Sequence, residues 1–201
     1  LVASRSSEAV SEFFITHPAV ERIMARGETK SSVRLKSGIQ ADLRVVHPEQ
    51  YPSALNYFTG SKEHNIALRS RALSKGWTLN EYRLGPDEKS TKSCDPVPSI
   101  HSEDDLYRAL GLDFIEPELR EDRGEIEAAE SHRLPQLIKM ENLRGAFHNH
   151  TTASDGRSTL EEMAEAARGL GLQYLGISDH SVSSYQARGL EVSRLLQQVA
   201  E

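Results

Sequence analysis

Three histidines and one aspartate in the C-terminal third of the chain have the types and spacing of metal ligands. His148 and His150 are two residues apart after a short apolar run, and Asp155 follows in a Ser-Asp-Gly sequence. His180 comes directly after a second apolar run. Neutral imidazole and carboxylate groups together suit zinc, manganese or iron. We therefore predict a metal site, with structural histidines as the alternative.

The elements expected around these residues would bring them to one edge of a sheet. Residues 145–147 and 174–177 read as strands, and the apolar spacing of residues 159–172 predicts a helix between them. If the first strand continues, its period of two puts His148 and His150 on the same side. The ligands would then lie at the carboxyl ends of parallel strands, where α/β barrels hold theirs.

This stretch resembles the beginning of a PHP (polymerase and histidinol phosphatase) domain, whose barrel holds up to three divalent metals. Carried over residue by residue, the resemblance makes His148, His150, Asp155 and His180 ligands of Mn²⁺ or Zn²⁺. It implies that a metal-activated water attacks a phosphodiester. Four ligands do not complete a trinuclear cluster, so we expect the remaining ligands downstream of residue 201.

A second candidate site lies on a predicted β-hairpin near the N-terminus. Residues 32–36 and 39–46 alternate in polarity around a Ser-Gly turn. The apolar set from Ile39 to Val45 would face a core, whereas Asp42 and Arg44 would stand on the open face of the sheet. The pattern alone leaves two explanations equally open, an exposed ion pair on a solvated face or a carboxylate ready for a divalent metal.

Two helices are expected after the hairpin. Gly60 ends the first, and Ser61 caps the second, which stops at Gly76. Asn65 and Arg69 are four residues apart and therefore share a helix face.

The run from Tyr57 to Tyr82 resembles the palm–thumb junction of family X DNA polymerases over more than twenty positions. The resemblance implies that Asp42 is the third metal-binding aspartate of the palm, with Mg²⁺ or Mn²⁺ as the cofactor. It implies that Arg44 pairs with the active-site carboxylates.

The same resemblance assigns residues to the incoming nucleotide and the DNA. Without it, Tyr57 and Phe58 would be more typical of core aromatics. With it, the residues beside the sugar of the nucleotide are Tyr57, Phe58 and Gly60. Asn65 and Arg69 would face the nascent base pair and the template from the minor groove.

Other segments carry weaker patterns. These predict a strand end at 1–3, helices at 8–14, 18–26 and 106–110, a strand at 77–84 and a loop at 85–99. The acidic run 116–130 is read as a solvated helix and linker, not a metal site.

Composition is that of a soluble globular protein. The 201 residues are 37% hydrophobic and 27% charged, with no apolar stretch of membrane-spanning length and no signal peptide. The single cysteine, Cys94, excludes an internal disulfide and fits a reducing cytoplasm. Because the chain starts without Met and stops inside a helical pattern, we expect it to be a piece of a longer protein.

Charge divides the chain into two parts. The net charge of −6 argues against indiscriminate nucleic-acid binding. However, residues 1–92 hold 14 Lys and Arg against 10 Asp and Glu, and residues 93–201 hold 10 against 20. The basic front half could meet a phosphate backbone, whereas the acidic back half could hold cations.

The order of these segments resembles a bacterial family X DNA polymerase of the PHP-bearing type over nearly the whole chain. The implied fold is an α+β palm and thumb portion followed by the first βαβ unit of an α/β PHP barrel. The expected parts are late palm at 1–48, thumb at 49–123, acidic linker at 124–143 and the start of the PHP domain at 144–201.

The resemblance implies an enzyme that fills short gaps in DNA repair and also has a metal-dependent 3′–5′ exonuclease or phosphodiesterase activity. Its partners would be gapped or nicked DNA and a dNTP, without a membrane. We expect a monomer in the cytoplasm, associated with the nucleoid. Since Asp42 alone cannot hold two metals, we expect little turnover from these 201 residues alone. The alternatives are a PHP-type phosphatase or phosphoesterase for small molecules and a non-catalytic DNA-binding module.

Overall fold

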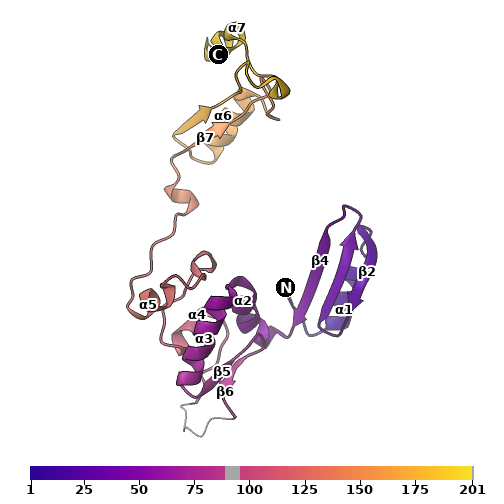
Figure 1. The fold of residues 1–201 in the computed structure, drawn as a ribbon, viewed down its shortest axis with the longest axis vertical. Helices are drawn as coiled ribbons and strands as arrows, with labels where there is room; N and C mark the ends of the chain where they lie inside the picture. The colour runs from indigo at the N-terminus through magenta and orange to yellow at the C-terminus, as the bar shows by residue number, and fades with distance from the viewer. Residues whose placement is uncertain (89–95, 201) are drawn as a thin grey trace. The chain divides into compact units, whose positions relative to one another are not determined.

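The computed structural model describes residues 1–88 and 96–200 and divides the chain into two units, Leu1–Pro135 and Gln136–Glu201 (Figure 1). The division falls inside the segment expected to be a linker. The described residues form two sheets in the first unit and one in the second, and each unit is described by itself below.

The first unit opens with a four-stranded sheet in the order β1-β4-β3-β2. Its strands are β1 (Val2–Ala3), β2 (Val20–Arg26), β3 (Lys30–Leu35) and β4 (Gln40–Val46). β1 is parallel to β4, and the other pairs are antiparallel. Helix α1 (Ser7–Ile15) lies against one face of the sheet, where Val33, Leu43 and Val45 are buried (Figure 1).

The predicted hairpin is confirmed, with Gly38 at the turn in the left-handed region at a φ of 85°. Ile39 does not join the core as expected. It is 63% exposed because it still belongs to the turn before β4 begins.

The helix expected at residues 18–26 is wrong, because this segment is strand β2. Val20, Ile23 and Met24 have a helical spacing, but irregularities in the β2–β3 register interrupt the two-residue alternation of a strand. The sequence therefore lacked the period by which an edge strand is recognised.

Helices α2 (Tyr51–Thr59) and α3 (Lys62–Ser74) meet at a sharp corner. The helix limits expected from Gly60, Ser61 and Gly76 are confirmed: the Ser61 hydroxyl accepts a hydrogen bond from the His64 N–H at 3.1 Å. Gly76, with a φ of 76°, follows the end of α3.

The single strand expected at 77–84 is instead a hairpin of β5 (Trp77–Leu79) and β6 (Leu84–Pro86). The Asn80 side chain makes the turn, because its Oδ1 accepts from the N–H groups of Tyr82 and Arg83 at 2.9 and 3.0 Å. The loop expected at 85–99 starts after β6, and residues 89–95, including Cys94, lie outside the described residues.

Helix α4 (Glu103–Ala109) follows the Ser102 cap, so it begins three residues before the expected start. The short helix α5 (Glu125–Glu130) packs on the hydrophobic core that α3, α4 and the β5–β6 hairpin share. The acidic segment is therefore not a solvated linker over its whole length: Ile126 and Ala129 are buried, and Glu125 is buried with them. The described residues also form four 3₁₀ turns, at Pro48–Gln50, Pro117–Leu119, Met140–Asn142 and Tyr185–Ala187.

The core beneath these helices contains a buried charge. Arg120 is fully buried and donates to Glu103 Oε1 at 2.7 Å, to Thr59 Oγ1 at 2.5 Å and to the Ile115 carbonyl at 2.9 Å. Its guanidinium also lies over the ring of Tyr107, 5.3 Å from the centroid. Removing one partner of such a pair leaves an uncompensated buried charge.

A second buried group lies beside the first. The His64 imidazole contacts Glu125 Oε1 through Nδ1 at 2.6 Å and lies 3.0 Å from the Tyr107 hydroxyl through Nε2. The Tyr107 hydroxyl donates to Asn56 Oδ1 at 2.8 Å. Side chains of α2, α3, α4 and α5 thus meet at one point.

The second unit contains β7 (Gly145–Asn149), α6 (Leu160–Gly169) and β8 (Tyr174–Ile177), with the two strands parallel. The expected βαβ unit is present, although α6 ends three residues earlier than expected. Helix α7 (Val192–Ala200) follows. No helix among the described residues is long and apolar enough to cross a membrane.

We predict that Glu103→Gln lowers the free energy of unfolding of the first unit by about 3 kcal/mol, because the buried guanidinium of Arg120 loses its counter-charge. Asp104→Asn is the matched control, since Asp104 is also in the first turn of α4 but pairs with Arg108 on the surface. The control should cost less than about 1 kcal/mol. Urea unfolding measures both, and equal losses would contradict the prediction.

We also predict that the first unit loses stability as the pH falls from 7 to 4. Burial lowers the pKa of His64 from its usual 6.5. For Glu125 burial acts in the opposite direction, but hydrogen bonds from His64 and backbone N–H groups outweigh it and lower the pKa below 4.5. The unfolded chain therefore binds more protons in this range, which favours unfolding as the pH falls.

Urea midpoints at several pH values test this, with His64→Gln as the comparison. The glutamine keeps hydrogen-bonding groups but does not titrate, so its stability should change less between pH 7 and 5.5. An unchanged slope in the variant would exclude His64 as the cause.

Candidate functional site

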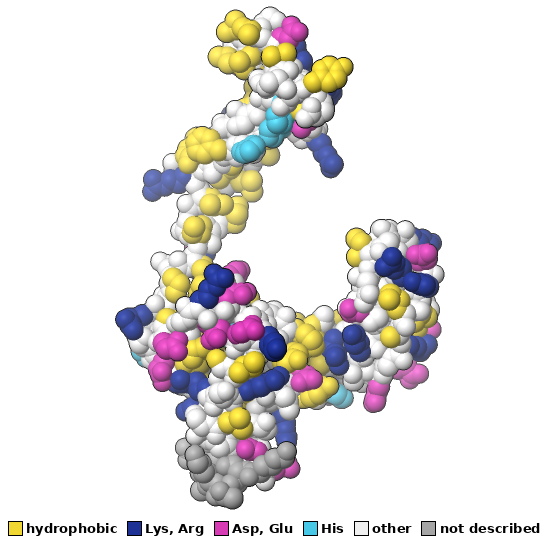
Figure 2. All heavy atoms as spheres, viewed as in Figure 1, with side chains coloured by type: hydrophobic (Ala, Val, Ile, Leu, Met, Phe, Trp, Pro, Cys, Tyr) yellow, Lys and Arg dark blue, Asp and Glu magenta, His cyan; other side chains and the backbone are white. Residues whose placement is uncertain are grey.

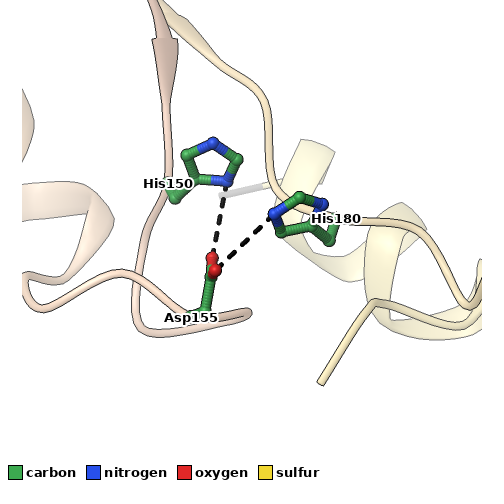
Figure 3. A group of neighbouring side chains, drawn as sticks. All are labelled: His150, Asp155 and His180. Carbon is green, nitrogen blue, oxygen red and sulfur yellow. Dashed lines mark ion pairs between the residues drawn. The ribbon is translucent and has the colours of Figure 1, made fainter. Parts of the chain in front are cut away.

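Three of the four predicted metal ligands come together in the second unit (Figure 3). His150 follows β7, Asp155 lies in the next loop and His180 follows β8. His150 Nδ1 lies 3.5 Å from Asp155 Oδ1, and His180 Nε2 lies 3.6 Å from Asp155 Oδ2. The two imidazole rings are stacked, with centroids 4.6 Å apart.

This arrangement fits a divalent metal. Each residue offers one ligand atom, and the three atoms all lie within 4.8 Å of one another. Nitrogen and oxygen ligands about 2.1 Å from a tetrahedral metal are separated by about 3.4 Å, close to the distances observed. His150 Nδ1 is buried without a hydrogen-bond partner among the described residues, so a ligand to this nitrogen would satisfy it.

His148 is not a member of this group of three. Its φ is 64°, and the β7–β8 register shifts between Ala146 and Asn149. The strand is therefore irregular at this point, and the placement of His148 and His150 on the same side stays a prediction. His148 is exposed, although its ring centroid is only 5.2 Å from that of His150.

The loop between β7 and α6 folds back on itself. Gly156 N donates to the Thr151 carbonyl at 2.9 Å, and a Cβ at Gly156 would lie 2.1 Å from the His150 carbonyl oxygen. Only glycine allows this close approach. The turn returns Asp155 to His150, five residues earlier in the chain.

Asp179 is a residue of this site that the sequence prediction missed. Its carboxylate accepts hydrogen bonds from Thr151, Ser154 and Gln198. Burial works to raise the pKa of Asp179, but these hydrogen bonds outweigh it and lower the pKa to about 2. The only signal in the sequence was its position beside His180.

The second candidate site, around Asp42, is exposed to solvent. Asp42 is exposed on β4, opposite Ser32 on β3, and accepts from Gln40 Nε2 at 3.2 Å. Hydrogen bonds from Ser32 and Gln40 lower the pKa of Asp42. No group of three possible metal ligands in the described part of the chain includes Asp42.

Arg44 does not pair with Asp42 in the described residues. Its Nη1 donates to Thr29 Oγ1 at 3.4 Å, and its guanidinium lies 5.7 Å from the centroid of the Phe58 ring. This contact joins β4 to α2. Figure 2 shows basic side chains at several places on the first unit and histidine side chains exposed on the second.

The α2–α3 corner gathers the residues expected to face the nucleotide. Asn65 Nδ2 lies within 3.0 to 3.2 Å of the carbonyl oxygens of Tyr57, Gly60 and Ser61, so its amide holds the corner together. Arg69 lies over the Tyr57 ring, 5.4 Å from the centroid. The structure thus brings this set of side chains together, and the amide N–H groups of Asn65 donate to backbone carbonyl oxygens.

Comparison with known proteins gives the following similarities. Residues 54–121 match the sequence model of the family described as DNA polymerase beta thumb. Over 203 aligned residues and its whole length, the chain is 36% identical to the DNA polymerase/3′-5′ exonuclease PolX of Bacillus subtilis, of which it covers 34%. It is 33% identical to DNA polymerase lambda of Rattus norvegicus over 85 residues, covering 40% of this chain and 15% of that protein.

Among solved structures, a ternary gap complex of Leishmania infantum polymerase beta aligns with a TM-score of 0.45 and 24% identity. That alignment covers 60% of this chain and 53% of the other. The chain spans about a third of the length of the Bacillus subtilis relative and less of the others.

We predict that Mn²⁺ or Zn²⁺ stabilises the second unit, since a ligand that binds only the folded state adds about 2.7 kcal/mol at a concentration of 100 times its Kd. His180→Ala removes one of three ligands and should abolish the shift. His101→Ala, at an exposed histidine of the first unit, should leave it unchanged. Calorimetric titration and thermal unfolding measure both effects, and unchanged affinity in His180→Ala would contradict the site.

Proposed function

The chain belongs to the family X DNA polymerases, and we propose that it is part of an enzyme that fills short gaps in DNA during repair. We further propose that its second unit begins a PHP domain with metal-dependent 3′–5′ exonuclease or phosphodiesterase activity. The observation that carries both proposals is the alignment of the whole chain with one relative, whose name joins a DNA polymerase to a 3′–5′ exonuclease.

In this proposal the first unit contributes the end of the palm, residues 1–48, and the thumb, residues 49–123. Helix α5 belongs with the thumb, because it packs on the thumb core, and the rest of 124–143 links to the PHP unit at 144–201.

Asp42 would act as one of the carboxylates that hold Mg²⁺ or Mn²⁺ for phosphoryl transfer. Its exposure on the open face of β4 and its lowered pKa keep it ionised and accessible. Further carboxylates must come from other parts of the full-length protein, since two metals need more ligands than one aspartate offers. Arg44 would then be available for those carboxylates, because it is not committed to Asp42.

The α2–α3 corner would hold the incoming dNTP and the nascent base pair. Tyr57 and Phe58 pack edge to face, with centroids 5.0 Å apart, and Phe58 is 46% exposed. Gly60 leaves little room for a side chain at the corner, because a Cβ there would lie 3.0 Å from His64 Cδ2. Asn65 fixes the corner from inside, and Arg69 beside Tyr57 would contact the template from the minor groove.

In the second unit, His150, Asp155 and His180 would hold a divalent metal, Mn²⁺ or Zn²⁺, with exposed His148 close enough to serve a neighbouring ion. A metal bound there would supply Lewis-acid activation of water and of the phosphodiester. The residues of this chain would orient that metal: Asp155 lies within 3.6 Å of one nitrogen of each imidazole, and the loop turn at Gly156 holds it there.

The partners of the full-length enzyme would be gapped or nicked DNA and a dNTP. We propose that it works as a monomer in the bacterial cytoplasm at the nucleoid. The mildly basic first 92 residues suit contact with a phosphate backbone.

We predict that, in the full-length protein, Asp42→Ala lowers filling of a one-nucleotide gap by at least about a hundredfold, since several kcal/mol of metal-based charge stabilisation are lost. Degradation from the 3′ end should persist. The double variant His150→Ala/His180→Ala should show the reverse pattern. Glu21→Ala, an exposed carboxylate on the same sheet, is the control for Asp42.

Primer extension and 3′ degradation are measured on one labelled duplex with Mn²⁺. Undiminished synthesis by Asp42→Ala would refute the polymerase role of this residue. Faster turnover of a sugar phosphate than of DNA would favour a small-molecule phosphoesterase in the second unit.

A further inference from the structure

We propose that Asp179 is a positioning residue for the metal site: its carboxylate sets where His150, Asp155 and His180 lie relative to one another. The proposal rests on the proposed metal site and deepens it. It assigns a role to a side chain that is outside the group of ligands itself.

The carboxylate of Asp179 is fully used by hydrogen bonds. Oδ1 accepts from the Thr151 N–H at 2.7 Å and from the Ser154 hydroxyl at 2.5 Å. Oδ2 accepts from the Thr151 hydroxyl at 2.6 Å and from Gln198 Nε2 at 2.6 Å. An ionised carboxylate offers about four lone-pair sites, so none is left for a metal. Asp179 therefore acts through its neighbours.

Three of these four contacts come from residues that are next to a predicted ligand in the chain. Thr151 directly follows His150, Ser154 directly precedes Asp155, and Asp179 itself directly precedes His180. A single carboxylate is thus one residue away from every member of the group. Any shift of this carboxylate would move all three ligand-bearing backbones.

The partners of Asp179 are held firmly. Thr151 is 2% exposed and Ser154 is fully buried. Water cannot readily reach their hydroxyls, so loss of the hydrogen bonds to Asp179 would leave buried donors unsatisfied, which costs free energy. Helix α7 adds a further contact to the same loop, because Arg194 Nη2 donates to the Ala153 carbonyl at 2.8 Å. The loop is therefore fixed from β8 and from α7 together.

Side chains that orient metal ligands commonly change metal affinity by about 10- to 100-fold when they are replaced. We therefore expect Asp179→Asn to weaken binding of Mn²⁺ and Zn²⁺ within that range. The NH₂ group of the asparagine would replace one carboxylate oxygen and would then face the donors that this oxygen accepts from. Thr151→Val removes one hydroxyl from the same carboxylate and should weaken binding in the same direction. Thr151→Ser keeps the hydroxyl and should restore it.

The experiment is calorimetric titration of the chain with each metal, together with the visible absorption spectrum of bound Co²⁺. The spectrum reports ligand geometry, which a loss of folding stability alone would not alter while the variant stays folded. Circular dichroism of the metal-free variants at low temperature identifies those that are folded. If Asp179→Asn does not fold, the proposal is tested by comparing the metal affinities of Thr151→Val and Thr151→Ser.

Unchanged affinity and an unchanged Co²⁺ spectrum in Asp179→Asn, or in Thr151→Val, would overturn the proposal while leaving the metal site intact. Failure of the metal site itself gives a different result, since the unaltered chain would then bind no better than His180→Ala. Weakened binding with an altered spectrum in Asp179→Asn, and recovery in Thr151→Ser, supports the positioning role.

Discussion

Burial of Arg120 is the constraint on which the first unit depends. A guanidinium cannot be neutralised by losing its proton, so a buried arginine needs a counter-charge and acceptors around it. Glu103 from α4, Thr59 from the end of α2 and the Ile115 carbonyl supply these groups for Nη1 and Nε, whereas Nη2 is buried without a hydrogen-bond partner among the described residues. The Ser61 N–H donates to the Arg120 carbonyl at 2.9 Å. The α2–α3 corner is thereby held from below. The nucleotide-facing role proposed for this corner therefore depends on a segment about sixty residues further along the chain.

The second unit also contains a partly buried charged group that its neighbours stabilise, but this charge is negative. Asp179 is partly buried, and hydroxyl, amide and backbone donors surround it in place of a cation. In both units a charged group at the end of one segment fixes a loop from another segment. In both units the residues proposed to bind the nucleotide or the metal are neighbours of the residues that are fixed: they lie at the α2–α3 corner and after the carboxyl ends of β7 and β8.

The sequence predicted best what local chemistry decides. Ser61 as a helix cap, Gly76 after α3 and the Gly38 hairpin turn all depend on the backbone preferences of one or two residues. Features set by partners distant in the chain were missed. Strand β2 needs its ladder with β3, and the burial of Ile126 in α5 needs the core that α3 and α4 also share. Three of the four ligands were still brought together, because they depend on the ends of two parallel strands.

The two proposed chemistries differ in how far they depend on the rest of the protein. The group of His150, Asp155 and His180 is built within about thirty residues, and every contact that orients it lies inside the second unit. Its first metal should therefore bind without help from the first unit. Asp42 is a single accessible carboxylate, and its neighbours Ser32 and Gln40 stabilise its charge without adding a second ligand. Because metal-assisted phosphoryl transfer requires several carboxylates around two ions, the local structure at Asp42 prepares one ligand and cannot by itself define the site.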